Sequence, residues 1–149
     1  MTETLEIVAP PQAATPSLKK RTLPITERTD VTLEELQGTS FPYSTELYNG
    51  KVVFKMASPE HGIIQGRMIT RMNLYLETVA AGLAMTETNF KLWPERERQS
   101  RVPDVAFVRK ERLPQDLRQF PGLAPDLAVE IISPEDHFLQ VMNKVDEYL

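Results

Sequence analysis

The sequence predicts an α/β fold in which one central mixed β-sheet is flanked by helices. Helical and strand-like segments follow one another in the order helix, two strands, helix, three strands, helix, which suits a sheet with helices packed on it. The pair Asn49-Gly50 lies between two strand-like runs and is the strongest short-range signal for a β-hairpin. Residues 125–134, PDLAVEIISP, form an apolar run typical of a strand covered on both faces.

Length and composition indicate a single domain. A chain of 149 residues with 41% apolar content is long enough for one core and too short for two ordinary ones. Residues 1–28 are rich in Pro, Thr and Ala and have little periodicity, so we expect a flexible N-terminal tail before a domain over 29–149. The absence of Cys excludes a disulfide framework and a thiolate metal site.

The expected location is the cytoplasm. The N-terminal residues carry acids and prolines where a signal peptide needs a basic start and an apolar core. No apolar run is long enough to cross a membrane, so we expect a soluble protein without a membrane partner. The net charge of −4 argues against a protein that coats nucleic acid non-specifically, but it leaves room for a local binding site.

A short helix and the hairpin are expected first in the domain. Thr32 and Glu35 have the spacing of a capping box, and Gly38 marks the end of that helix. The segment STELYNGKVVFKM then supplies the two strands of the hairpin around Asn49-Gly50.

The longest helix is expected over about 60–81. Ser58-Pro59 opens it and Gly82 is expected to stop it. We assign no special role to His61, a polar residue in its first turn. Apolar residues at roughly helical spacing mark the face expected to be buried: Ile64, Met68, Met72, Tyr75, Leu76 and Val79.

Three strands and a last helix complete the expected fold. The strands are expected at about 83–93, at 102–108 and within the run 125–134. After Ser133-Pro134 the chain is expected to turn helical. Apolar residues of this last helix can form one stripe: Phe138, Met142, Val145 and Leu149.

Two acids in the last two strands are the candidate site. The period of two places each beside an alanine on one strand face, Asp104 with Ala106 and Glu130 with Ala128. If these faces align, the alanines leave a shallow space between the carboxylates, wide enough for a hydrated ion. Such an oxygen-rich site suits Mg²⁺ or Mn²⁺, which keep several waters and need only one or two carboxylates.

Each acid also has a structural explanation when taken alone. Asp104 can start a strand in solvent after Pro103, and Glu130 can lie near a strand end and reach water. Together these explanations are weaker, because two carboxylates in runs that look buried repel each other unless a cation lies between them.

Several motifs resemble the PD-(D/E)xK nuclease superfamily and, within it, the Uma-two (Uma2) family of restriction endonucleases. They are RVPDVAFV, APDLAVEIISP and a lysine shortly before the terminal DEYL, with TELYNGKVV and PEHGIIQGRM upstream. The similarity spans 32–149. It implies a restriction-endonuclease-like α/β fold. Relatives continue into further strands after DEYL, so a chain that is complete at Leu149 is expected to lack C-terminal strands.

The resemblance also implies the site residues. Asp104 and Glu130 become the metal-binding acids, with the backbone carbonyl of Ile131 as a further ligand. Glu46 matches the acid of the family's first hairpin and would act through the metal or its water. Ile132 stands where the superfamily's tripeptide usually has lysine, and the Uma2 pattern assigns that role to a lysine on the following helix, Lys144.

Two main readings of function follow, ahead of a purely structural α/β domain, which would require the buried acids to be accidental. The first is an endonuclease that uses Mg²⁺ or Mn²⁺ to hydrolyse DNA phosphodiester bonds, with Asp104, Glu130, Lys144 and Glu46 as catalytic residues. The alternative is a catalytically weak or inactive relative that binds nucleic acid or a partner protein, because fold alone does not decide activity. A homodimer is compatible with either reading.

Overall fold

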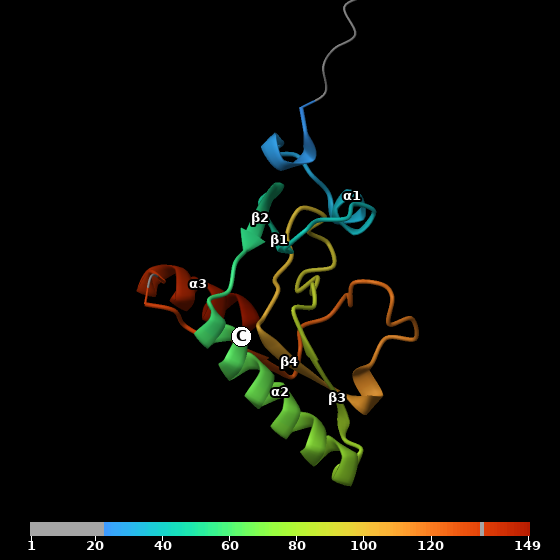
Figure 1. Cartoon of the computed structure of the whole chain (residues 1–149). Coiled ribbons are helices and arrows are strands. Elements are labelled where there is room, and N and C mark those ends of the chain that lie inside the picture. Colours follow the sequence, from blue (N-terminus) through green and yellow to red (C-terminus); the bar gives the residue numbers. More distant parts are fainter. Residues whose placement is uncertain (1–22, 135) are drawn as a thin grey trace, which may run out of the picture.

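The computed structural model describes residues 23–134 and 136–149 and confirms the predicted α/β class and order of elements (Figure 1). Its helices are α1 (Leu33–Gln37), α2 (Pro59–Val79) and α3 (Phe138–Tyr148), with short 3₁₀ turns η1 (Ile25–Glu27) and η2 (Lys110–Arg112). Its strands are β1 (Ser44–Tyr48), β2 (Lys51–Lys55), β3 (Gly82–Thr86), β4 (Val105–Arg109) and β5 (Leu127–Val129). Within the described ranges, no helix has both the length and the apolarity of a bilayer span.

The strands form two sheets where one central mixed sheet was expected, and every strand pair in the described residues is antiparallel. One sheet is the β1–β2 hairpin and the other has the order β3-β4-β5. Helix α2 packs on the three-stranded sheet. Helix α3 lies at the end of this sheet next to Glu130, so helices flank the sheet as expected (Figure 1). In the β4–β5 pair Ala106 lies opposite Ala128, which confirms the predicted alignment of the two faces.

The N-terminal elements form as their capping and turn residues predict. Thr32 and Glu35 make both hydrogen bonds of the capping box at the start of α1. Asn49 and Gly50 turn the hairpin with positive φ angles of 48° and 77°. A Cβ on Gly50 would lie 2.4 Å from the carbonyl oxygen of Thr29, so the turn also needs the absence of a side chain.

One hydrophobic cluster joins α1 to the hairpin, and part of the expected tail contributes to it. Val31, Leu33, Leu36 and Leu47 are its buried members, and Ile25 packs against them. Arg28 binds the Glu35 carboxylate. Residues 23–28 therefore contact the domain, whereas the rest of the expected tail, residues 1–22, lies outside the described residues.

Helix α2 begins as predicted but ends earlier than predicted. The Ser58 hydroxyl accepts a hydrogen bond from the His61 N–H, and Pro59 occupies the first turn. The helix ends at Ala80, which takes the left-handed conformation with φ 46°. Gly82 is not the stop that the sequence predicts. It is the first residue of β3, where an added Cβ would lie 2.1 Å from the Val108 carbonyl oxygen.

The strand expected over 83–93 is shorter in the structure. β3 ends at Thr86, since Glu87 takes a positive φ of 49° and breaks the ladder. Phe90 pairs with Arg101 in a separate bridge and enters a second buried cluster with Ala106 and Val108.

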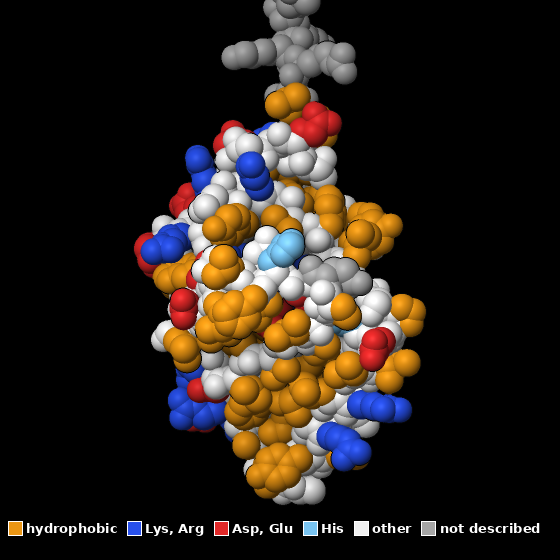
Figure 2. Space-filling model, turned by 90° about the vertical axis from the view of Figure 1, so that its left-hand side faces the viewer, with side chains coloured by type: hydrophobic (Ala, Val, Ile, Leu, Met, Phe, Trp, Pro, Cys, Tyr) orange, Lys and Arg blue, Asp and Glu red, His pale blue; other side chains and the backbone are white. Residues whose placement is uncertain are grey.

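Both longer helices leave apolar residues exposed. On α2, Met68, Met72 and Leu76 are half-buried as expected, whereas Tyr75 is 64% exposed. The predicted stripe of α3 faces outward, with Phe138 74% exposed and Leu149 fully exposed. Figure 2 shows hydrophobic side chains gathered on this side of the molecule. The stripe faces outward because α3 turns its polar side to the acids described below.

Gly82→Ala is expected to lower the free energy of unfolding by about 3 kcal/mol, because the added methyl group meets backbone and the strand has no room to shift. Gly66→Ala in α2 is the matched control. It has open space around its added Cβ and is expected to raise stability by about 0.5–1 kcal/mol, the gain of Ala over Gly in a helix. Urea unfolding measures both, and equal stability of the two variants would contradict the packing described for β3.

Candidate active site

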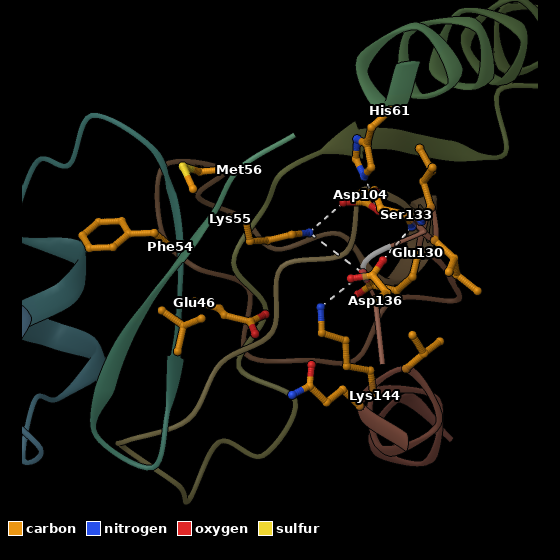
Figure 3. Close-up of a pocket in the computed structure, with 15 residues that line it drawn as sticks. Glu46, Phe54, Lys55, Met56, His61, Asp104, Glu130, Ser133, Asp136 and Lys144 are labelled. Atoms are coloured by element: carbon orange, nitrogen blue, oxygen red, sulfur yellow. Dashed lines mark hydrogen bonds and ion pairs between the residues drawn. The ribbon is translucent and has the colours of Figure 1, made fainter. Parts of the chain in front are cut away.

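Asp104 and Glu130 face each other just beyond the end of the β4–β5 ladder. The last paired residues are Val105 and Val129, so the next residue on each strand continues the register outside the ladder. Both carboxylates line one cavity of about 340 Å³ (Figure 3). The structure therefore brings together the two acids expected from the strand pattern.

Asp104 is buried and has a partner on each side. Its side chain is 2% exposed, and its Oδ1 accepts from Lys55 Nζ at 2.7 Å. Its Oδ2 lies 3.1 Å from His61 Nε2 and accepts from the Ile131 N–H at 2.6 Å. Burial raises the pKa of Asp104, but the hydrogen bonds from Lys55 and Ile131 outweigh it and lower the pKa below its ordinary value. Asp104 is therefore an anion at neutral pH.

Glu130 is held mainly by the last helix. Lys144 Nζ donates to its Oε2 at 3.3 Å, and the Tyr148 hydroxyl donates to its Oε1 at 2.9 Å. Lys55 Nζ approaches the same Oε2 at 3.9 Å. Burial raises the pKa of Tyr148, and the Glu130 charge adds to this, so the phenol stays protonated as a donor. Lys144 thus lies beside Glu130, where the sequence placed it, while its catalytic role stays a prediction.

Glu46 lines the same cavity from β1 and is held by a buried arginine. Arg101 Nη1 donates to Glu46 Oε1 at 3.0 Å, and the same guanidinium binds Glu147 of α3. Glu46 Oε2 is buried and has no hydrogen-bond partner among the described residues. Glu46 therefore offers one free carboxylate oxygen near the two central acids.

Lys55 and His61 are site residues that the sequence reasoning missed. Lys55 ends β2, and the hairpin register places it on the same strand face as Glu46, a signal that was available. His61 was expected to need no special role. It is instead buried at the start of α2, with Nε2 on Asp104 and no described partner for Nδ1. Its contact depends on how α2 packs on the sheet, which helical spacing does not reveal.

The donor set fits a divalent cation in chemistry and charge. Two carboxylates face one space, and the Lys55 ammonium already lies between them as a positive charge. Within the described residues, no group of three or more His, Cys, Asp or Glu is arranged to hold a metal ion. An ion would therefore bind Asp104 and Glu130 and complete its shell with water or backbone oxygen. The Ile131 N–H binds Asp104, and a ligand role for the Ile131 carbonyl stays a prediction.

Comparisons with known proteins identify the family and the fold. The model of the Uma2 family, described as "Putative restriction endonuclease", matches residues 32–149. The chain is similar to a solved structure described as a putative nuclease belonging to DUF820 from Anabaena variabilis, with a TM-score of 0.62 and 23% identity, over 80% of this chain and 68% of that chain. At this identity the likeness shows the fold. No curated protein matched the sequence.

Asp104→Asn is expected to lower the free energy of unfolding by about 3 kcal/mol at pH 7, because it removes the nearer carboxylate partner of the largely buried Lys55 ammonium. The exposed pair Asp116–Arg118 supplies the control Asp116→Asn, which is expected to change stability by less than about 0.5 kcal/mol. Urea unfolding of the three proteins measures these differences.

The effect of Asp104→Asn is also expected to depend on pH. Because the folded-state pKa of Asp104 is lowered, its carboxylate stabilises the fold above the unfolded value of about 4, and this stabilisation is lost as pH falls through the folded pKa. The difference in free energy of unfolding between wild type and variant should therefore become smaller below about pH 4. If this difference in free energy stays constant from pH 7 to pH 3, the Asp104 carboxylate does not stabilise the fold through its charge.

Proposed function

The chain belongs to the Uma2 family of putative restriction endonucleases, and we propose that it is a metal-dependent endonuclease that hydrolyses DNA phosphodiester bonds. The observation that carries this proposal is the cavity in which Asp104 and Glu130 face each other with Lys144 beside them. Paired carboxylates and a lysine are the groups that metal-assisted phosphodiester hydrolysis needs.

Asp104 and Glu130 are proposed to hold Mg²⁺ or Mn²⁺. When bound, such an ion polarises the phosphoryl group and lowers the pKa of a bound water. The protein contributes the placement of the two acids. His61 and the Ile131 N–H fix the Asp104 carboxylate, and Tyr148 fixes that of Glu130, so the donor oxygens are oriented before an ion arrives.

Lys144 is the proposed cation for the charge that develops on the phosphoryl oxygens. It reaches the cavity from α3, and its one carboxylate partner among the described residues is Glu130, at the long distance of 3.3 Å. Ile132, at the position where the superfamily usually has its lysine, is 65% exposed and carries no charge. The role of the superfamily's lysine is therefore assigned to Lys144 on α3. Glu46, with its free Oε2, is proposed to bind a water of the ion or the attacking water.

A second function is favoured by one contact. The Lys55 ammonium between the two acids would suit a relative that has no metal and serves as a nucleic-acid-binding or protein-binding module. Metal binding separates the two proposals, because only the endonuclease requires it. A cytoplasmic location and a homodimer stay predictions of the sequence.

Lys144→Met is expected to reduce Mg²⁺-dependent DNA cleavage by about 100-fold or more, because the developing charge loses its cation. The same variant should bind Mn²⁺ like the wild type, because both proposed ligand carboxylates remain. Cleavage of a plasmid substrate and calorimetric titration with Mn²⁺ measure the two properties.

Two further variants complete this test. Glu130→Gln should lose both cleavage and Mn²⁺ binding, and the exposed Lys110→Met should lose neither. Cleavage by Lys144→Met at the wild-type rate would overturn the role of Lys144. Tight Mn²⁺ binding by Glu130→Gln would overturn the proposed ligand set.

A further inference from the structure

Lys55 contacts both proposed metal-binding acids. Its Nζ lies 2.7 Å from Asp104 Oδ1 and 3.9 Å from Glu130 Oε2, and it also donates to the Val102 carbonyl at 2.7 Å (Figure 3). An ammonium has three donors and no acceptor, so these oxygens are the partners it requires. The space between these three oxygens therefore suits a positively charged group.

Lys144 does not share this position. It lies within ion-pair distance of Glu130 but makes no ion pair with Asp104 in the described residues. Lys55 comes from the hairpin and Lys144 from α3, so the two lysines approach the acids from different elements (Figure 3). Their roles can therefore be separated by mutation.

The Lys55 ammonium and a divalent ion would need the same oxygens. A divalent ion binds carboxylate oxygens directly, at about 2.1 Å for Mg²⁺, and an ammonium between the same oxygens occupies that space. Two cations this close in a largely buried place also repel each other strongly. Both cannot therefore neutralise Asp104 and Glu130 at once.

We propose that Lys55 is a built-in counter-cation that neutralises Asp104 and Glu130 in the metal-free protein and must leave them when a divalent ion binds. This inference rests on the proposed function, because it concerns the same two acids. Residues 56–58 follow Lys55 and carry no regular structure, and a lysine has a flexible four-carbon stem, so the ammonium can move into the adjoining cavity.

The exchange has a benefit and a cost. Without metal, the ammonium keeps the two facing carboxylates from repelling each other, so the site stays assembled. When metal binds, the Lys55 contacts must first break. The apparent affinity for the ion is then the intrinsic affinity multiplied by the fraction of molecules in which Lys55 has left the acids.

The experiment compares wild type, Lys55→Met and the control Lys51→Met by calorimetric titration with Mn²⁺ and by thermal melting with EDTA or Mn²⁺. Lys51 lies on the same strand but is exposed and makes no ion pair within the described residues. We expect Lys55→Met to bind Mn²⁺ at least about tenfold tighter than wild type. Its melting temperature should be lower in EDTA and should rise more on adding Mn²⁺, while Lys51→Met should match wild type.

The outcomes separate this inference from the proposed function. Equal or weaker Mn²⁺ binding by Lys55→Met, with binding by wild type, would overturn the displacement and leave the metal site in place. Absence of Mn²⁺ binding in both proteins would overturn the metal dependence and the displacement together.

A measurement on the wild type covers the case in which Lys55→Met fails to fold. The Lys55 ammonium, with its three oxygen neighbours, should give a protected side-chain nitrogen signal in the NMR spectrum of the metal-free protein. Saturation with Mg²⁺ should remove that protection. A Lys55 signal that is unchanged while the signals of Asp104 and Glu130 shift would overturn the proposal.

Discussion

The opposition of Asp104 and Glu130 is the constraint on which the rest of this structure depends. Two carboxylates at the end of one strand pair, one of them almost fully buried, repel each other unless cations and donors surround them. The β4–β5 register makes this opposition unavoidable, since Ala106 and Ala128 pair directly and the acids follow two residues further along each strand face.

Three separate elements of the domain supply the compensating groups. The hairpin contributes Lys55, α2 contributes His61, and α3 contributes Lys144 and Tyr148. The acids therefore connect segments that hydrophobic burial joins only in part, because most of the buried apolar residues fall into two small clusters, neither of which lines the cavity. Charge compensation and tertiary structure depend on the same contacts.

Local signals in the sequence were sufficient for the elements whose cause is local. The capping box of α1, the Asn49-Gly50 turn and the facing alanines require only neighbouring residues or a period of two, and the structure has all of them. The end of α2 was misplaced because Gly82 is needed for close approach to β4, a contact far away in the sequence. His61 was missed for the same reason, since its partner Asp104 lies 43 residues away, whereas Lys55 shares a strand face with Glu46 and could have been found from the hairpin register.

The outward apolar stripe of α3 has a consequence for how the domain opens. This helix is attached through Lys144, Glu147 and Tyr148, that is, through ion pairs and hydrogen bonds, while Phe138 and Leu139 remain in solvent. No residue of α3 belongs to either hydrophobic cluster, whereas one of these clusters joins α1 to the hairpin. We therefore expect α3 to be a separate unit of local stability, able to open while the strands stay paired. Such an opening would withdraw Lys144 and Tyr148 from Glu130 and leave the β3–β4–β5 sheet intact.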